Sequence, residues 1–326
     1  MIPPALPPVP PRSIGSPMPD EARLAPLGWL DEAPVTQALL WLNAAIFAME
    51  AVLAHSVTIL PQRIALELGA SESLATVGEF RWETLVTACF LHDGLLHVGF
   101  NMLVLWQAGP LVERTVGSAR MAPMYLAAGV CGNALSVAYR WFSHAGTLAR
   151  VGFFDQPVSM GASGAIAGIL AGAVVLGWRF EGWRGPMTQA MLRWVGINAV
   201  CGALSAWTGG HIDNAAHLGG ALTGGLIALG WGRRAMAPPA AGIPLACCAA
   251  VLFASIAVVA VRDRTDRFAA LTLQDRYDFT HEALADGRCA DAEAGLMAVE
   301  RLRAKMAPVR SLRSSVDEIC GHSIDP

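Results

Sequence analysis

Long apolar segments alternate with short polar ones between about residue 35 and residue 262 of this 326-residue chain. Each segment approaches the roughly 20 residues that an α-helix needs to cross the hydrocarbon core of a bilayer. The pattern therefore predicts seven membrane-spanning helices, with bounds good to a few residues. The predicted spans cover 35–55, 96–113, 120–142, 162–180, 187–208, 213–232 and 241–262.

Composition supports the same conclusion. The chain is 54% hydrophobic and only 15% charged, whereas soluble domains carry roughly a quarter charged residues. We therefore expect an all-α polytopic membrane protein embedded in a lipid bilayer. The net charge of −3 comes with no basic tract, so no nucleic-acid partner is expected. No Cys/His cluster has the spacing of a zinc site, and we expect neither a metal nor a cofactor.

Polar segments flank the apolar region. Residues 1–33 are rich in proline, which predicts a disordered leader rather than a cleaved signal peptide. Residues 263–326 form a polar tail with alanine and leucine at helical spacing around a glycine turn, as in one hairpin of the tetratricopeptide kind. Nothing identifies a partner for this tail. Cys289 and Cys320 could pair there in an oxidising compartment, and the sequence leaves that pairing open.

Basic residues in the short loops predict the orientation. Three loops on one side hold six arginines, and the loops on the opposite side hold two. The excess of positive charge marks the cytoplasmic side, which places the N-terminus in the cytoplasm and the tail outside. Together with the absence of an organelle-targeting leader, this arrangement suggests a bacterial inner membrane. The six are Arg114, Arg120, Arg179, Arg184, Arg233 and Arg234, the two are Arg140 and Arg150, and Arg63 and Arg81 in the long first loop reduce the margin.

Polar side chains inside membrane spans are costly, so each is a candidate for function. His97 and Asn101 open the second span, Ser163 opens the fourth, and His217 opens the sixth. These spans run in the same direction, and therefore their first residues lie at one face of the membrane. The 54 residues from Ser163 to His217 are enough for one span down, one span back and the connecting loops, at about 20 residues per span.

Small residues surround both side chains. Gly161 and Gly164 flank Ser163, and Gly220 and Gly224 form a G-x-x-x-G face after His217. Such faces let helix backbones pack closely in lipid. Close packing of the fourth and sixth spans is what a hydrogen bond between the serine and the histidine requires.

Each of these residues also has a structural interpretation. A single serine in a span commonly bonds its own backbone, and His97 with Asn101 could form a polar clamp between helices. The co-occurrence of a serine, a base and two side-chain donors favours acyl transfer.

In this order, the stretches FLHDGLLHVGFNM, GPLVERTVGS, GASGAIAG and IDNAAHLGG resemble the rhomboid family of intramembrane serine proteases. The resemblance covers about residues 36–232. It implies a six-helix catalytic core, taken here as 34–232, followed by a seventh transmembrane helix at 241–262 and the tail at 263–326. It also implies cleavage of transmembrane protein substrates.

The resemblance assigns roles to individual residues. Ser163 in GxSG would be the nucleophile and His217 the base, without a third carboxylate. His97 and Asn101, in the pattern that begins at His92, would stabilise the oxyanion. Two further pairs also match: Arg81 and Trp82 resemble the Trp/Arg pair of the first loop in inverted order, and Glu113 and Arg114 match a pair expected to serve stability.

One position departs from the family pattern. The residue four after the nucleophile, often an aromatic that packs against the catalytic histidine, is Ala167. Something else must then orient His217, or activity is lower. Asp213 could contact His217 on the same helix face, although capping of the sixth span is the favoured interpretation.

Three functions compete. The first is a serine endopeptidase that cleaves transmembrane segments through an acyl-enzyme. The second is a catalytically weak or inactive rhomboid-like pseudoprotease that binds membrane proteins, which Ala167 alone favours. A small transporter would be expected to show repeated halves or broken, charge-lined spans, and the sequence has neither.

Overall fold

The computed structural model describes residues 32–147, 158–208, 212–231, 242–302 and 307–321. All but the last two residues of the predicted leader lie outside this part. Seven long helices follow in the predicted order, and five of them are long and apolar enough to cross a membrane. The predicted class, an all-α polytopic membrane protein, is confirmed. The seven are α1 (Pro34–Ala54), α5 (Leu95–Val116), α6 (Ser118–Thr147), α7 (Ser163–Glu181), α8 (Pro186–Thr208), α9 (Asn214–Gly230) and α10 (Gly242–Thr265); the five are α1, α5, α6, α7 and α10.

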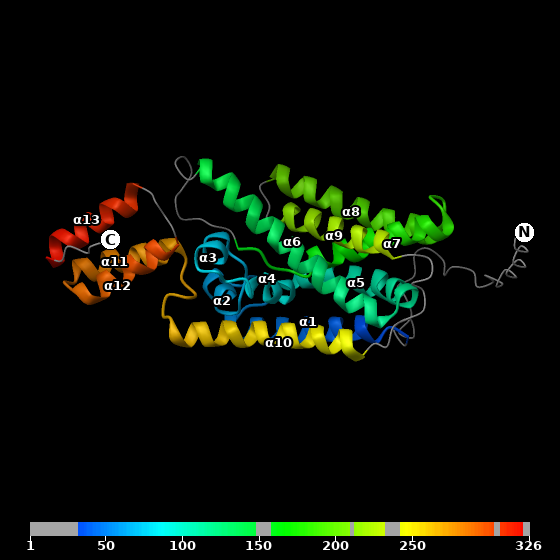
Figure 1. The fold of residues 1–326 in the computed structure, drawn as a ribbon, viewed down its shortest axis with the longest axis horizontal. Coiled ribbons are helices and arrows are strands. Elements are labelled where there is room, and N and C mark those ends of the chain that lie inside the picture. The colour runs from blue at the N-terminus through cyan, green and yellow to red at the C-terminus, as the bar shows by residue number, and fades with distance from the viewer. Residues whose placement is uncertain (1–31, 148–157, 209–211, 232–241, 303–306, 322–326) are drawn as a thin grey trace, which may run out of the picture.

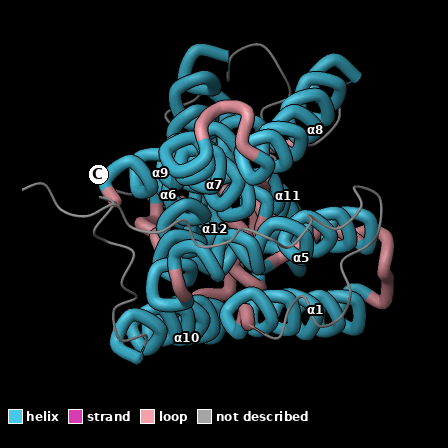
Figure 2. The backbone as a smooth tube through the Cα atoms, turned by 90° about the vertical axis from the view of Figure 1, so that its right-hand side faces the viewer, coloured by secondary structure: helices cyan, strands magenta, loops and turns pink. Residues whose placement is uncertain are grey.

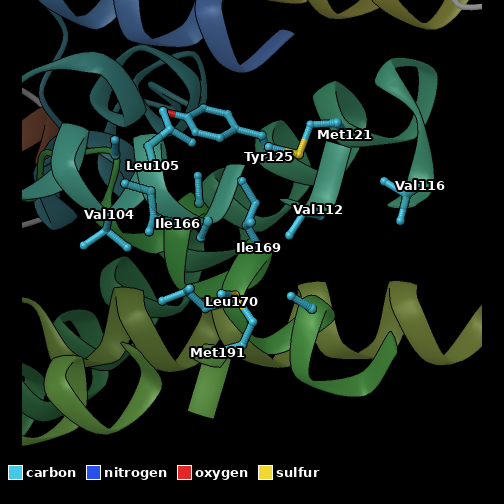
Figure 3. Packing of buried hydrophobic residues seen from close by; sticks show 14 of the residues in the cluster. Val104, Leu105, Val112, Val116, Met121, Tyr125, Ile166, Ile169, Leu170 and Met191 are labelled. Carbon is cyan, nitrogen blue, oxygen red and sulfur yellow. The ribbon is translucent and has the colours of Figure 1, made fainter. Parts of the chain in front are cut away.

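Helix α7 is central to the bundle. It packs against α9, α6, α8 and α5, and its buried side chains Ile166, Ile169 and Leu170 face a core that includes Leu105 and Tyr125 (Figure 3). Helix α8 lies on the side of the bundle opposite α1 and α10 (Figures 1 and 2). Helix α8 packs mainly against α7, and most of its buried residues, Met187, Thr188 and Met191, lie in its first two turns.

Glu113 joins three elements at the end of α5. Its carboxylate accepts hydrogen bonds from the Val35 and Thr36 N–H groups at the start of α1, at 2.9 and 2.7 Å, and from the Ser118 hydroxyl at 2.6 Å. A carboxylate at a helix N-terminus satisfies N–H groups that have no partner within the helix. The stabilising role that the family resemblance implies for Glu113 fits these contacts.

Four short helices form the connection between α1 and α5. Arg81 is buried in it and lies near Glu83 and Asp263 at 3.6 and 4.0 Å, whereas Trp82 is exposed. Arg81 therefore ties this connection to the end of α10. The short helices are α2 (Gln62–Glu67), α3 (Ser73–Gly78), α4 (Thr84–Thr87) and the 3₁₀ helix η2 (Ala88–Phe90).

The tail folds into α11 (Leu273–Ala285), α12 (Cys289–Arg301) and α13 (Ala307–Cys320), at the left of Figure 1. A disulfide joins Cys289 to Cys320. Arg276 forms a two-pronged ion pair with Glu79, at 2.6 and 3.1 Å, which fastens the tail to the α1–α5 connection. The division of the chain into leader, core, seventh helix and tail remains a prediction.

Candidate active site

Ser163 is the first residue of α7 and follows a constrained turn. Gly161 has φ of +128°, a conformation that residues with a β-carbon rarely adopt. The Gly161 N–H donates to the Ala88 carbonyl at 2.8 Å, and Ser159 pairs with Ser71 through two backbone hydrogen bonds. The segment before α7 is thus fixed to the α1–α5 connection. Ser163 is half-buried, and the N–H groups of the first turn of α7, which have no partner within the helix, lie beside it.

Helices α7 and α9 meet backbone to backbone. A β-carbon added to Gly164 would lie 3.3 Å from the Ala216 carbonyl oxygen, and one added to Gly168 would lie 2.8 Å from the Gly220 carbonyl oxygen. A β-carbon on Gly224 would collide with the backbone of Gly168. The chain neighbours of Ser163 and His217 are therefore in contact across the two helices. This contact uses Gly164, Gly220 and Gly224 of the predicted packing face.

His217 lies in the first turn of α9 and is half-buried. Among the described residues, neither its ring nor the Ser163 hydroxyl forms a hydrogen bond. The predicted hydrogen bond between the two side chains is thus not formed in this conformation. Catalytic hydrogen bonds are often long without substrate and tighten when it binds.

His97 and Asn101 lie one helical turn apart on α5. A β-carbon placed on Gly161 would be 2.8 Å from His97 Nε2 and 3.6 Å from Ser163 Oγ, so the ring and the hydroxyl both lie beside Gly161. The Asp93 N–H approaches His97 Nδ1 at 3.5 Å, which favours the tautomer with its proton on Nε2. Asn101 is buried, and its Nδ2 has no partner among the described residues. Both side chains hold a donor that an incoming oxygen atom could use.

Asp213 caps α9 and links it to two other segments. One carboxylate oxygen accepts from the Ala216 N–H at 3.0 Å, and the other accepts from Ser159 and Arg140 at 2.7 and 2.9 Å. The Ser136 hydroxyl also donates to this second oxygen, at 2.5 Å. Because both oxygens are engaged and neither bonds the His217 ring, the capping interpretation is correct.

Electrostatics at Asp213 follow from the same contacts. Burial acts to raise the pKa of this carboxyl group, but the Arg140 guanidinium and the hydrogen bonds outweigh burial and lower the pKa below its usual range.

The sequence did not identify Ser159, Ser136 and Arg140 as partners of Asp213. The only feature of the sequence that points to Ser159 is its position four residues before Ser163. A single polar residue in a loop does not by itself predict a role at the site.

A cavity of about 440 Å³ opens beside the histidine, between α7, α8 and α9. His217 and Ala167 both line it, together with Asn198 of α8 and Asn214 of α9. At Ala167, the position where the resemblance leads one to expect an aromatic ring, the space beside His217 is therefore open. Asn214 Nδ2 donates to the Gly202 carbonyl at 3.0 Å, which fastens the start of α9 to α8 at one end of this cavity.

The sequence is similar to those of known rhomboid proteins. Residues 79–234 match the model of the rhomboid domain. Over 165 residues the chain is 34% identical to rhomboid protease GluP of Bacillus subtilis (strain 168), a match that covers 49% of this chain and 28% of that protein. It is 34% identical over 153 residues to rhomboid-type serine protease 2 of Emericella nidulans, covering 46% of this chain and 26% of that protein.

A mitochondrial protein is also similar. Rhomboid protein 1 of Saccharomyces cerevisiae is 32% identical over 155 residues, covering 45% of this chain and 41% of that protein. The chain thus spans between about a quarter and a half of the length of the relatives it matches. No solved structure matches it.

Proposed function

Because the chain belongs to the rhomboid family, we propose that it is an intramembrane serine endopeptidase in which Ser163 is the nucleophile and His217 the general base. The observation that carries this proposal is the backbone contact between Gly164 and Ala216. It fixes the residue after the serine against the residue before the histidine. In this proposal a side-chain movement brings the hydroxyl and the imidazole to hydrogen-bonding distance when the substrate binds.

The reaction follows from the groups around Ser163. His217 accepts the hydroxyl proton while Oγ bonds to the carbon of a peptide carbonyl, and the carbonyl oxygen becomes an oxyanion. In this proposal His97 Nε2–H, Asn101 Nδ2–H and the Ser163 backbone N–H donate to that oxygen. Loss of one such donor costs about 2.7–4 kcal/mol of transition-state stabilisation in soluble serine proteases.

Three proton transfers complete the cycle. The C–N bond breaks as His217 returns its proton to the departing amine, which leaves an acyl ester on Ser163. Water then gives a proton to His217 and its oxygen attacks the ester. The carboxylic acid product leaves, and the proton returns to Ser163 Oγ.

The substrates in this proposal are transmembrane segments of other membrane proteins. A helix has to unwind before its backbone can reach Ser163, so small, helix-weakening residues are expected near the cleaved bond. The cavity beside His217 offers room between α7, α8 and α9 for part of an unwound segment.

We also propose that the N-terminus is cytoplasmic, in the inner membrane of a bacterium. The arginine distribution supports this orientation. The Cys289–Cys320 disulfide supports it independently, because disulfides persist in oxidising compartments and this orientation places the tail outside.

The alternative is a rhomboid-like pseudoprotease that binds membrane proteins and cleaves them slowly or not at all. The open space at Ala167 favours it, since no aromatic ring fills the cavity beside His217 at that position. In this case the cavity would serve binding alone.

The test is cleavage of a model transmembrane substrate by the purified full chain in proteoliposomes. We expect turnover by the wild type that Ser163→Ala and His217→Ala abolish. Ser255→Ala is the matched control, because Ser255 lies in α10 and bonds only its own helix at 2.9 Å. Labelling of Ser163 by a fluorophosphonate probe, measured in parallel, separates the two functions. Cleavage by Ser163→Ala at the wild-type rate would overturn the proposed protease function. Absence of labelling at Ser163 in the wild type would favour the pseudoprotease function.

A further inference from the structure

A carboxylic acid lies inside the first membrane span with no part in the reaction above. Glu50 is in α1, five residues before its last turn ends at the C-cap His55, and its residue exposure is 1%. An ionisable side chain in a span is costly, so it calls for an explanation in terms of function or assembly. Glu50 Oε1 accepts a hydrogen bond from the His92 backbone N–H at 3.0 Å, and Oε2 has no partner among the described residues.

His92 connects Glu50 to the candidate oxyanion site. It is fully buried in the turn before α5, and its ring meets the His97 ring edge-on, with centroids 5.2 Å apart and planes at 70°. Burial, reinforced by the nearby His97, lowers the pKa of His92 to about 3. His92 is thus neutral at physiological pH, and it contacts His97 as an apolar aromatic edge rather than as a charge.

Two close neighbours therefore limit the movement of His97. The His92 ring packs against the His97 ring, and Gly161 lies so near that it leaves no room for a β-carbon beside His97 Nε2. The plane of the His97 ring decides whether Nε2–H points at the oxygen that develops beside Ser163. Donors to an oxyanion must lie about 2.7–3.1 Å from that oxygen, so a small tilt of the ring removes the bond.

We propose that Glu50 is a positioning residue for the oxyanion site. Its carboxyl group holds the main chain at His92, and the His92 ring in turn sets the plane of His97. The role needs an oxygen acceptor at Glu50 and does not need a negative charge. It rests on the proposed function, because it assumes that His97 donates to an oxyanion.

The test compares Glu50→Ala, which removes the acceptor, with Glu50→Gln, which keeps an oxygen of the same shape and reach. Asn43→Ala is the matched control, because Asn43 is a buried polar residue of the same helix that donates to its own helix at Leu39. In proteoliposomes we expect Glu50→Ala to lower kcat about 10- to 100-fold with little change in KM. Deleting an oxyanion donor lowers kcat by about 10²–10³, and a misplaced donor should lower it by no more than that. The Ki of a peptide aldehyde, whose adduct places an oxygen in the oxyanion site, should rise in parallel. Glu50→Gln should restore both values to near wild type.

A second measurement does not depend on turnover. The side-chain NMR shifts of His97 in the substrate-free protein should move in Glu50→Ala and stay unchanged in Glu50→Gln and Asn43→Ala. In addition, Glu50→Ala should add little to the loss caused by His92→Ala, because residues that act through one another are not additive.

Three results would overturn the proposal. These are a Glu50→Ala variant with wild-type kcat and His97 shifts, a Glu50→Gln variant as slow as Glu50→Ala, or equal losses in Glu50→Ala and Asn43→Ala. A wild-type protein without Ser163-dependent turnover would instead reject the proposed function. The His97 shifts would still decide whether Glu50 positions that ring.

Discussion

Gly220 of α9 lies directly against the carbonyl group of Gly164 of α7, with no room for a β-carbon between the two helices. Without a hydrophobic driving force between helices in lipid, such small-residue contacts supply much of the packing. Because Gly164 follows Ser163 in the chain, the same contact sets the distance from the serine to α9. Stability and active-site geometry are therefore coupled at this point.

This coupling predicts the effect of one methyl group. Gly220→Ala should lower the thermal unfolding temperature and reduce kcat, because overpacking costs about 1–3 kcal/mol and moves His217 away from Ser163. Gly225→Ala is the control, since a β-carbon there meets no atom within 4 Å. Thermal unfolding in detergent and turnover in proteoliposomes test both variants. Equal behaviour of the two variants would contradict the packing argument.

Asp213 predicts a dependence of stability on pH. Its pKa is lowered in the folded protein, so its contribution is present at neutral pH and is lost as the pH falls through the folded pKa. At pH 7, Asp213→Asn should cost at least about 1.5–3 kcal/mol, the value of one hydrogen bond to a charged group. The difference from wild type should shrink below about pH 4.

Unfolding at several pH values measures this difference. Asp278→Asn is the control, because Asp278 is exposed on α11 and bonds only Gln274. A penalty for Asp213→Asn that stays constant down to pH 3 would rule out the charge of Asp213 as its source.

The cavity beside His217 predicts a gain of function. Ala167→Tyr would fill part of the roughly 440 Å³ and place a ring against the histidine. A better-oriented base should raise the rate of fluorophosphonate labelling at Ser163 several-fold, since a positioned general base contributes about 10²–10⁴ in rate. Ala171→Tyr, one turn further along α7 in the same cavity, should leave that rate unchanged. A slower reaction in Ala167→Tyr would mean that the open cavity itself serves the reaction.

Much of this arrangement is predictable from the sequence. Apolar periodicity gives the helices, and counting residues per span brings Ser163 and His217 to one face. The glycine spacing indicates which helices touch, because a G-x-x-x-G face in lipid typically packs against another helix. These features are local or repeat along the chain.

The remaining contacts join residues far apart in sequence. Glu50 meets His92 across 42 positions and Asp213 meets Arg140 across 73. No local pattern pairs Glu50 with His92 or Asp213 with Arg140, and a buried acid in a span indicates only that some partner is needed. The sequence did not decide whether Cys289 and Cys320 pair for a related reason. The two cysteines lie in separate helices, and the sequence alone does not determine how these helices pack.

Arg276 predicts how the tail is held. Its side chain is fully buried against Glu79, so Arg276→Met leaves that carboxylate with only the longer ion pair to Arg301, at 3.9 Å. Removing one partner of a buried ion pair costs about 3–5 kcal/mol, and the tail should then separate from the α1–α5 connection. Limited proteolysis should cut between α10 and α11 faster than in wild type. Arg63→Met, which breaks the exposed pair with Glu67, should not change the cutting rate.

The disulfide predicts both the stability and the location of the tail. Cys289 opens α12 and Cys320 ends α13, and the bond closes a loop across a sequence separation of 31. Closing a loop of that length limits the unfolded tail and stabilises the fold by about 3–4 kcal/mol in the chain-entropy model. Cys320→Ser should therefore make the tail more sensitive to protease, whereas Cys131→Ser, at a free exposed cysteine of α6, should not.

In intact cells, a maleimide reagent should modify Cys289 of the wild type only after reduction. Modification without reductant would show a reduced tail, and would contradict an oxidising compartment on the side of the membrane that holds Ser163.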